Sequence, residues 1–354
     1  MKAWRIEKHG GPEVLQYLDI STPNPNALEA RIRVQAVGLN HMDLWVRNGV
    51  SGHRFPLPLT PGCDVAGEID EIGSEAARRA LAANGLAVGS AVVLNPGVSC
   101  GCCEACLSGF DPICPHYGLL GETRDGGCAD FVVVPITSIV PRPTGVSAEE
   151  AAALPVAAVT AWSMLTRKAA LKAGETVLIQ AGGSGVSIYA IQLAKLLGAI
   201  VITTVGSAEK AAQAKTLGAD YVINYKEKPF REEVKKIQTE RDKKGVEIVI
   251  DHVGGETFKE SLKCLAWGGR LVTCGATADA KVEIDLRHVF FKNISIFGST
   301  IGSRSDLIRI MQLVEARKIR PVIDSMFSMD QYPQAVARLE SRDFFGKIVV
   351  RSSS

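Results

Sequence analysis

The chain has 354 residues, 46% of them hydrophobic, and a formal net charge of +2 from 40 basic and 38 acidic residues. This length is enough for two domains of ordinary size. The charges are well mixed and form no basic stripe, which argues against a nucleic-acid partner and favours a small-molecule substrate. No stretch approaches the roughly 18 apolar residues of a membrane span, and the N-terminal segment lacks the pattern of a secretion signal, so we expect a cytoplasmic protein.

Residues 1–150 are predicted to form a β-rich domain. Their short apolar or alternating runs are separated by proline and glycine clusters, which is typical of strands joined by turns. Ser74–Ala87 interrupts this pattern with good helix formers and predicts a surface helix. The strand candidates are Val14–Leu18, Glu29–Val37, Val65–Ile72, Ser90–Leu94 and Ala129–Val134.

Residues 151–304 are predicted to form a second domain of the α/β class. The alanine-rich segment Ala148–Leu165 predicts a linking helix with a break at Pro155, where a backbone donor is lost. Strand and helix patterns then alternate, which specifies a doubly wound parallel sheet covered by helices on both faces. We expect the last stretch, about residues 305–354, to return to the first domain and complete it.

The segment TVLIQAGGSGVS, residues 176–187, predicts a strand, a glycine turn and the start of a helix. Backbone N–H groups at such a helix start favour a phosphate group. Serines stand at the second and third glycine positions of the G-x-G-x-x-G pattern, so an ordinary strand-to-helix turn is the alternative for these residues taken alone. The residues expected to contact a dinucleotide are Gly182, Gly183, Ser184, Gly185, Val186 and Ser187.

A cysteine-rich loop carries the most specific local pattern. Cys100, Cys103, Cys106 and Cys114 are spaced so that one loop can place four thiolates around a tetrahedral zinc ion. Such a site has no open coordination position, so the predicted zinc is structural. Reduced surface cysteines are the alternative, and Cys102 is left over.

These motifs together resemble the medium-chain dehydrogenase/reductase family, in particular the zinc-type alcohol dehydrogenases and their quinone-reductase relatives. The resemblance runs from end to end. It implies a GroES-like catalytic domain, a Rossmann dinucleotide-binding domain, hydride transfer to or from a nicotinamide, and a homodimer or homotetramer. The matching stretches are Gly38–Asp43, Pro61–Gly67, the cysteine loop, Leu154–Thr160 and the glycine turn.

The resemblance fails at the catalytic metal. The positions that match the family's metal ligands carry Asn40, Cys63 followed by Asp64, and Val156. A carboxamide and a valine do not replace a thiolate, so we predict one structural zinc per chain and no catalytic zinc. An unorthodox site completed by Asp43, His41 or His53 is the alternative.

Without a catalytic metal, hydrogen-bond donors must polarise the substrate oxygen. Asn40 is the candidate donor, Cys63 is expected to line the site, and Asp64 or Asp43 would hold neighbouring side chains or pass a proton. Asn and Asp after a strand also commonly form turns with their own backbone, and for Asp43 we favour that structural role.

The predicted cofactor is NADP(H) rather than NAD(H). Gly206 stands at the end of the second Rossmann strand, where an acidic residue normally binds the ribose 2′-hydroxyl of NAD. Ser207 and Lys210 can contact a 2′-phosphate, and the resemblance implies a similar role for Tyr225. A solvated lysine and an ordinarily packed tyrosine are the alternatives.

The resemblance also implies further contacts with the cofactor. His41 is expected near the pyrophosphate and Thr160 at the nicotinamide face. Gly298 and Ser299 are expected on the carboxamide side, and Lys347 near the cofactor phosphates.

Three functions are compatible with the sequence. The first is NADP(H)-dependent hydride transfer to or from a small carbonyl, enone or quinone. The second is alcohol oxidation through an atypical metal at Cys63 and Asp64. The third is NADPH binding without catalysis.

Overall fold

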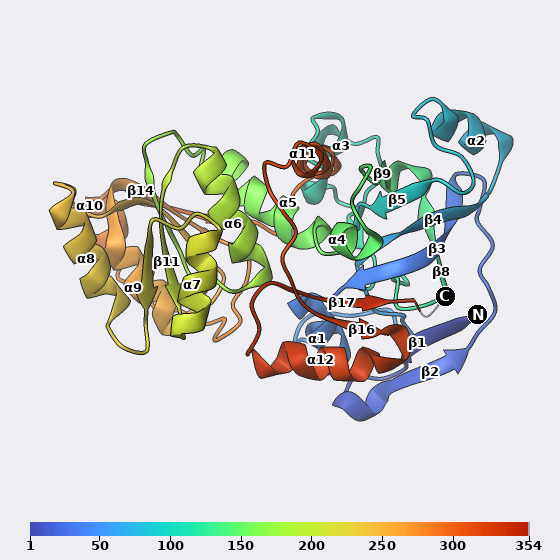
Figure 1. The fold of residues 1–354 in the computed structure, drawn as a ribbon, viewed down its shortest axis with the longest axis horizontal. Coiled ribbons are helices and arrows are strands. Elements are labelled where there is room, and N and C mark those ends of the chain that lie inside the picture. Colours follow the sequence, from blue (N-terminus) through green and yellow to red (C-terminus); the bar gives the residue numbers. More distant parts are fainter. Residues whose placement is uncertain (353–354) are drawn as a thin grey trace. The chain divides into compact units, whose positions relative to one another are not determined.

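The computed structural model describes residues 1–352, which form two compact units (Figure 1). Unit 1 comprises Met1–Ala157 and the chain from Ser303 onward, and unit 2 comprises Ala158–Gly302. The chain first passes from one to the other inside helix α5 (Pro155–Ser163). The break predicted at Pro155 is present, because α4 (Ala148–Ala152) ends before it and α5 begins at it.

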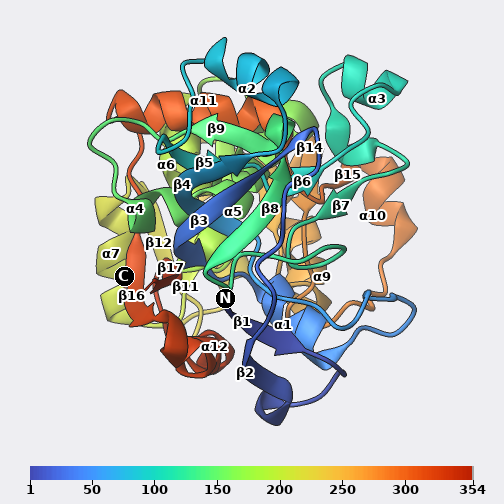
Figure 2. The same ribbon diagram turned by 90° about the vertical axis from the view of Figure 1, so that its right-hand side faces the viewer.

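Unit 1 is built on a seven-stranded, mostly antiparallel sheet, visible from the side in Figure 2. The strand order is β16-β17-β3-β4-β5-β9, and β8 pairs with β3 outside this path. Its apolar core lies against β3, β4 and β5 and includes Ile32, Val65 and Leu94. The strands are β3 (Glu29–Gly38), β4 (Asp64–Ile72), β5 (Ala91–Leu94), β8 (Phe131–Pro135), β9 (Ile139–Pro141), β16 (Ile323–Ser328) and β17 (Lys347–Arg351).

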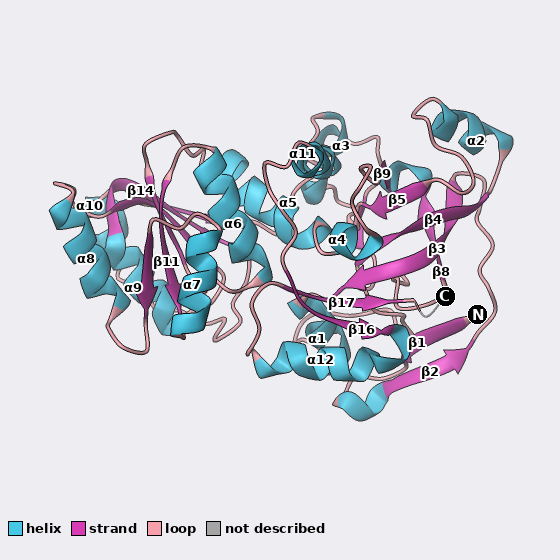
Figure 3. Ribbon diagram, in the orientation of Figure 1, coloured by secondary structure: helices cyan, strands magenta, loops and turns pink. Residues whose placement is uncertain are grey.

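Two small antiparallel pairs and several helices complete unit 1 (Figure 3). The pairs are β1 (Lys2–Ile6) with β2 (Leu15–Asp19), and β6 (Gly97–Val98) with β7 (Gly118–Leu119). The remaining α-helices are α1 (His41–Asn48), α2 (Glu75–Ala82), α3 (Glu104–Leu107), α11 (Arg304–Glu315) and α12 (Tyr332–Ser341). The 3-10 turns are η1 (Pro12–Val14), η2 (Asp111–Ile113), η3 (Ile136–Ser138) and η5 (Met329–Gln331).

Unit 2 contains a six-stranded parallel sheet in the order β12-β11-β10-β13-β14-β15. The chain order reverses between β10 and β13, and ligands of such sheets bind at the carboxyl ends of the strands beside this switch point. The strands are β10 (Thr176–Ile179), β11 (Ile200–Val205), β12 (Tyr221–Asn224), β13 (Val246–Asp251), β14 (Leu265–Thr273) and β15 (Ser295–Gly298). The helices are α6 (Gly185–Leu196), α7 (Ala208–Thr216), α8 (Phe230–Glu240), α9 (Gly255–Cys264) and α10 (Leu286–Phe291), with the π-helical segment η4 (Met164–Lys168) after α5.

The predicted α/β fold class is confirmed, since unit 1 has a mixed sheet and unit 2 a parallel one. The stretch Gly38–Asp43, which matches the family, contains the end of β3 and the start of helix α1. Helices α10 and α12 were not among the predicted elements. Helix α10 buries none of its residues, whereas the buried residues of α12 have the spacing of one helix face: Tyr332, Ala335, Val336 and Leu339. Within residues 1–352, no helix is both long and apolar enough to cross a bilayer.

Candidate functional site

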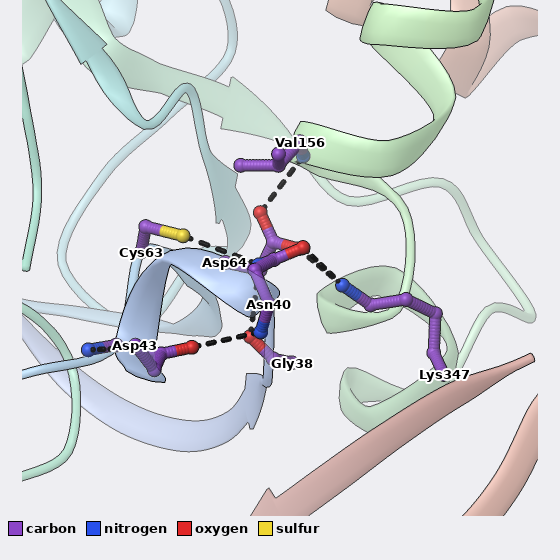
Figure 4. A network of polar contacts seen from close by, with 8 residues as sticks. Gly38, Asn40, Asp43, Cys63, Asp64, Val156 and Lys347 are labelled. Carbon is purple, nitrogen blue, oxygen red and sulfur yellow. Dashed lines mark hydrogen bonds and ion pairs between the residues drawn. The ribbon is translucent and has the colours of Figure 1, made fainter. Parts of the chain in front are cut away.

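Three neighbouring strands of unit 1, β17, β3 and β4, bring distant parts of the sequence together at one place in the sheet. In the register, Gly38 at the end of β3 lies opposite Asp64 at the start of β4 on one side and opposite Val349 of β17 on the other. Gly38 allows the chain to pass closely under α4, because a Cβ atom there would lie 2.2 Å from the carbonyl oxygen of Ala152. The residue pairs around this point form the polar network of Figure 4.

Asp64 is the centre of the network. Its Oδ2 accepts hydrogen bonds from Lys347 Nζ at 3.0 Å and from Asn40 Nδ2 at 2.8 Å, and its Oδ1 accepts one from the backbone N–H of Val156 at 2.8 Å. The side chains of Lys347 and Asp64 are 2% and 0% exposed. Both carboxylate oxygens are therefore engaged inside the protein, and the charge is balanced by a buried ammonium group.

The Asn40 amide bridges the other members of the network. Its Oδ1 accepts from Lys347 Nζ at 2.6 Å, while its Nδ2 lies 2.8 Å from Asp64 Oδ2 and 3.2 Å from Cys63 Sγ. Both ends of the amide are thus occupied by protein groups. A role for Asn40 as a donor to substrate stays a prediction, and the role visible in this geometry is to hold Lys347, Asp64 and Cys63 together.

Asp43 has a structural role at the start of helix α1. Its Oδ2 accepts from the backbone N–H of Asn40 at 2.7 Å and its Oδ1 from that of Gly62 at 3.0 Å. Burial raises the pKa of the Asp43 carboxyl to about 6, against the lowering effect of these hydrogen bonds. Asp43 fixes both the N-terminus of α1 and the turn before Cys63.

The residues around Asp64 do not fit a catalytic metal. Burial, and then the nearby carboxylates of Asp64 and Asp43, raise the pKa of the Cys63 thiol and keep it protonated. Val156 offers only a side chain without a ligating atom. Among residues 1–352, the one group of three or more histidine, cysteine or acidic side chains that could surround a metal ion is the cysteine loop.

The cysteine loop does fit a structural zinc ion. The distances Cys103–Cys106 and Cys100–Cys114 are 3.6 Å, and Cys100–Cys106 is 3.9 Å, measured between sulfur atoms. Four sulfurs bound at 2.3 Å from a tetrahedral centre lie about 3.8 Å apart. The four sulfur atoms of the predicted ligands all lie within 4.8 Å of one another, which fits the spacing of a four-cysteine zinc site.

The glycine turn in unit 2 has the features of a phosphate-binding helix start. Gly182 packs closely on β11, because a Cβ atom there would lie 2.5 Å from Thr203 Oγ1. Ser184 is the N-cap of α6, and its Oγ accepts from the backbone N–H of Ser187 at 3.2 Å. Gly183 precedes this cap, and Gly185 and Val186 form the first turn of the helix.

His252, which was not among the predicted site residues, contacts this turn. It follows β13, and its Nε2 lies 2.9 Å from Ser184 Oγ and 2.9 Å from Ser187 Oγ. It is 8% exposed, and burial lowers its pKa. Its position one residue after a strand that adjoins the switch point was the available signal.

The two hydroxyl residues of unit 2 that were predicted to contact the nicotinamide end of the cofactor are both buried. Thr160 in α5 and Ser299 after β15 are 2% and 8% exposed. The Oγ atoms of both are buried without a hydrogen-bond partner within the described part of the chain. Buried hydroxyls normally have a partner, so these atoms suit a ligand that supplies one. Gly298 ends strand β15 immediately before Ser299.

The end of β11 forms the candidate adenosine site. Gly206 lies beside the half-exposed Tyr225, since a Cβ atom on Gly206 would be 2.8 Å from Tyr225 Oη and 3.5 Å from Lys226 Cε. Ser207 is the N-cap of α7 and accepts from the backbone N–H of Lys210. Lys226 is the residue here that the sequence analysis missed, because only the pairing of β11 with β12 brings it next to Gly206.

His41 and Lys347 were both predicted to lie near the cofactor phosphates. His41 begins α1, and its ring contacts Trp45 edge-on at 5.4 Å between ring centroids. Lys347 directs its ammonium group to Asp64 and Asn40, in unit 1. Contacts of these two residues with cofactor phosphates stay predictions.

Comparison with known proteins agrees with this description. Residues 26–144 match the family model of the alcohol dehydrogenase GroES-like domain, and residues 185–316 match that of the zinc-binding dehydrogenase. The NAD-dependent alcohol dehydrogenase of Saccharolobus solfataricus is 32% identical over 99% of each chain. The quinone oxidoreductase of Mus musculus is 30% identical over 95% of this chain and 92% of its own.

A crystal structure of an NAD-dependent alcohol dehydrogenase superimposes with a TM-score of 0.92, at 42% identity and 99% coverage of both chains. A GroES-like unit joined to a parallel nucleotide-binding sheet defines the class of two-domain oxidoreductases that use a nicotinamide cofactor. Within that class, the chain belongs to the medium-chain dehydrogenase/reductase family. It is an NAD(P)-dependent oxidoreductase whose cysteine loop fits a structural zinc.

Proposed function

We propose that this protein is an NADP(H)-dependent oxidoreductase that transfers a hydride between the nicotinamide and a small carbonyl, enone or quinone without a catalytic metal. The observation that carries the proposal is the buried ion pair of Lys347 with Asp64. It stands where the family resemblance places the metal ligands. A divalent cation at Asp64 would have to displace the ammonium group or be repelled by it.

The neighbouring groups support the same proposal. Asp64 Oδ1 is held by the N–H of Val156, so its lone pairs point to protein donors. The Cys63 thiol is buried, and its raised pKa disfavours the thiolate that a metal would need. One of the relatives, from Mus musculus, is named a quinone oxidoreductase.

The preference for NADP(H) is supported by the groups around Gly206. A missing carboxylate removes the usual partner of the ribose 2′-hydroxyl and the charge that would repel a 2′-phosphate. Ser207, Tyr225 and the basic Lys226 surround the position, and Lys210 lies in the first turn of α7. Some of the named relatives are NAD-dependent alcohol dehydrogenases. The proposed preference for NADP(H) therefore comes from the residues of this chain and not from the names of its relatives.

The proposal includes assembly as a homodimer or homotetramer. Strand β15 is at one edge of the unit 2 sheet, with β14 as its only strand partner in residues 1–352. The adjoining helix α10 exposes Leu286, Phe290 and Phe291, and β15 exposes Ile296 at 38%. An uncovered apolar edge of this kind favours pairing with a second copy across a two-fold axis.

The decisive experiment combines metal analysis with a substrate panel. Zinc is counted in the purified protein, and NADPH and NADH oxidation is followed with aldehydes, quinones and enones, with and without a chelator. We expect one zinc per chain and chelator-resistant reduction of at least one substrate class. Two zincs per chain with chelator-sensitive alcohol oxidation would favour a metal-dependent alcohol dehydrogenase, and NADPH binding without turnover would favour a non-catalytic protein.

A further inference from the structure

We infer that His252 is a positioning residue for the cofactor pyrophosphate: its Nε2–H fixes the hydroxyl of Ser184 so that the Ser184 O–H points out of the protein as a donor to an anionic oxygen. The inference rests on nicotinamide cofactor binding by this family member. It is independent of whether the chain prefers NADP(H) and of whether a catalytic metal is present.

The hydroxyl proton of Ser187 determines which imidazole nitrogen of His252 is protonated. Ser187 is fully buried, and its Oγ donates to the backbone carbonyl of Gln180 at 2.7 Å. Its single hydroxyl proton is used in this bond. At 2.9 Å from His252 Nε2, Ser187 Oγ therefore accepts, so Nε2 carries the proton of the imidazole.

The same Nε2–H reaches Ser184. Ser184 Oγ lies 2.9 Å from His252 Nε2 and already accepts from the backbone N–H of Ser187 at 3.2 Å. A hydroxyl oxygen that accepts from both sides has its own proton directed elsewhere. Ser184 is half-buried at the start of α6, so that proton faces the turn where the N-terminus of the helix favours a phosphate group.

A buried polar network lies beside this arrangement and stabilises the fold around it. Gln180 Oε1 accepts from Thr204 Oγ1 at 2.6 Å, and Gln180 Nε2 donates to Ser261 Oγ at 3.0 Å. Ser261 Oγ in turn donates to Asp251 Oδ2 at 2.9 Å, next to His252 in the chain. Gln180, whose carbonyl accepts the Ser187 proton, is thus linked through Ser261 to Asp251, the residue before His252.

The opposite tautomer would reverse the effect. With Nε2 unprotonated, Ser184 would donate its proton to His252, and the hydroxyl would present only lone pairs to the phosphate oxygens. Burial lowers the pKa of His252, which keeps the ring neutral and leaves the choice of tautomer to the hydrogen bonds. Because Ser187 donates its proton to the Gln180 carbonyl, it can only accept from His252, which favours the Nε2–H tautomer.

The test uses cofactor binding by the full chain, measured as Kd for NADPH and for NADH. Ser184→Ala removes the hydroxyl donor to the charged pyrophosphate, and His252→Leu removes the N–H group that orients this hydroxyl, so we expect each to raise both Kd values by about 10- to 100-fold. Because the pyrophosphate is common to both cofactors, the ratio of the two Kd values stays unchanged. His252→Gln, which keeps a donor of similar reach, recovers most of the affinity.

The double variant His252→Leu/Ser184→Ala is expected to bind no more weakly than Ser184→Ala alone, because His252 acts on the cofactor only through the Ser184 hydroxyl. Ser261→Ala is the matched control: it removes a buried hydroxyl from the same network without touching Ser184. We expect it to lower the melting temperature and leave both Kd values within about twofold. Additive effects in the double variant, or an equal loss of affinity in Ser261→Ala, would show that His252 only supports the fold.

A second measurement needs no cofactor. The imidazole ¹⁵N shifts of His252 in the free protein are expected to report the Nε2–H tautomer in wild type and a loss of that preference in Ser187→Ala. An Nδ1–H tautomer in the wild-type protein would overturn the inference, whatever the protein's activity.

Discussion

Lys347 and Asp64 form an ion pair with 3.0 Å between Nζ and Oδ2 and almost no solvent contact on either side chain. Ion pairs this deeply buried contribute little net stability, because both charges lose their hydration. The pair is nonetheless hard to break from one side, since the remaining charge would be buried without a partner. This asymmetry makes the pair testable by stability measurements.

Replacing Lys347 with Met is expected to lower the free energy of unfolding by about 3–5 kcal/mol, because Asp64 would be left as an unpaired buried carboxylate. The double variant Lys347→Met/Asp64→Asn should recover part of the loss. Urea denaturation measures the free energy of unfolding of both variants. Lys226→Met, at an exposed lysine, is the control, and its free energy of unfolding is expected within about 0.5 kcal/mol of wild type. Equal losses in the single and double variants would show that Lys347 acts through packing alone.

The zinc prediction concerns the cysteine loop. Cys106→Ser removes one of four thiolates from a site whose sulfur atoms already lie at zinc-binding distances, so zinc content is expected to fall from about one per chain to nearly none. Hydrogen exchange should increase in residues 96–119, which contain the loop. Cys102→Ser, at the exposed spare cysteine, is the control and should keep its zinc. Unchanged zinc in Cys106→Ser would mean that the metal lies elsewhere.

Cofactor preference is expected to reverse in Gly206→Asp. The new carboxylate would repel a 2′-phosphate and accept from the ribose 2′-hydroxyl, raising Kd for NADPH at least about tenfold while Kd for NADH falls. The change is sterically mild, because the nearest atom is the hydroxyl of the half-exposed Tyr225. Gly206→Ala controls for the added carbon. Tighter binding of NADH than of NADPH by the wild-type protein, at matched salt, would contradict the proposed preference.

The pH prediction rests on Asp43, whose pKa is raised to about 6 by burial. In the unfolded chain the value is about 3.9, so the folded state binds more protons between pH 4 and 6. Stability from this group is therefore greatest below that window and is lost as pH rises through it, by ~3 kcal/mol in total. Asp43→Asn does not titrate and provides the reference.

The measurement is the difference in unfolding free energy between wild type and Asp43→Asn. From pH 6.5 to pH 5 we expect it to move by roughly 1 kcal/mol in favour of wild type. A difference that stays constant, or that moves the other way, would mean that Asp43 is ionised throughout this range.

The sequence alone determined those features whose residues lie close together along the chain. The four cysteines fall within one short loop, so their spacing was enough to predict the ligands that the structure gathers. The strand, glycine turn and helix at residues 176–196 follow from local apolar periodicity and turn chemistry. The α/β class follows in the same way, from the alternation of strand and helix patterns.

Only the tertiary structure decided the partners of buried polar groups. Lys347 is 283 residues from Asp64, and they meet because β17 pairs with β3 and β3 with β4. His252 is 68 residues from Ser184 and reaches it because β10 and β13 are neighbours in the parallel sheet. Strand pairing brings such groups together after long loops have closed, and local residue patterns do not specify which strands will pair. For this protein, the residues at the positions that match the family's metal ligands could be read from the sequence, whereas the position of the Lys347 ammonium group beside Asp64 required the tertiary structure.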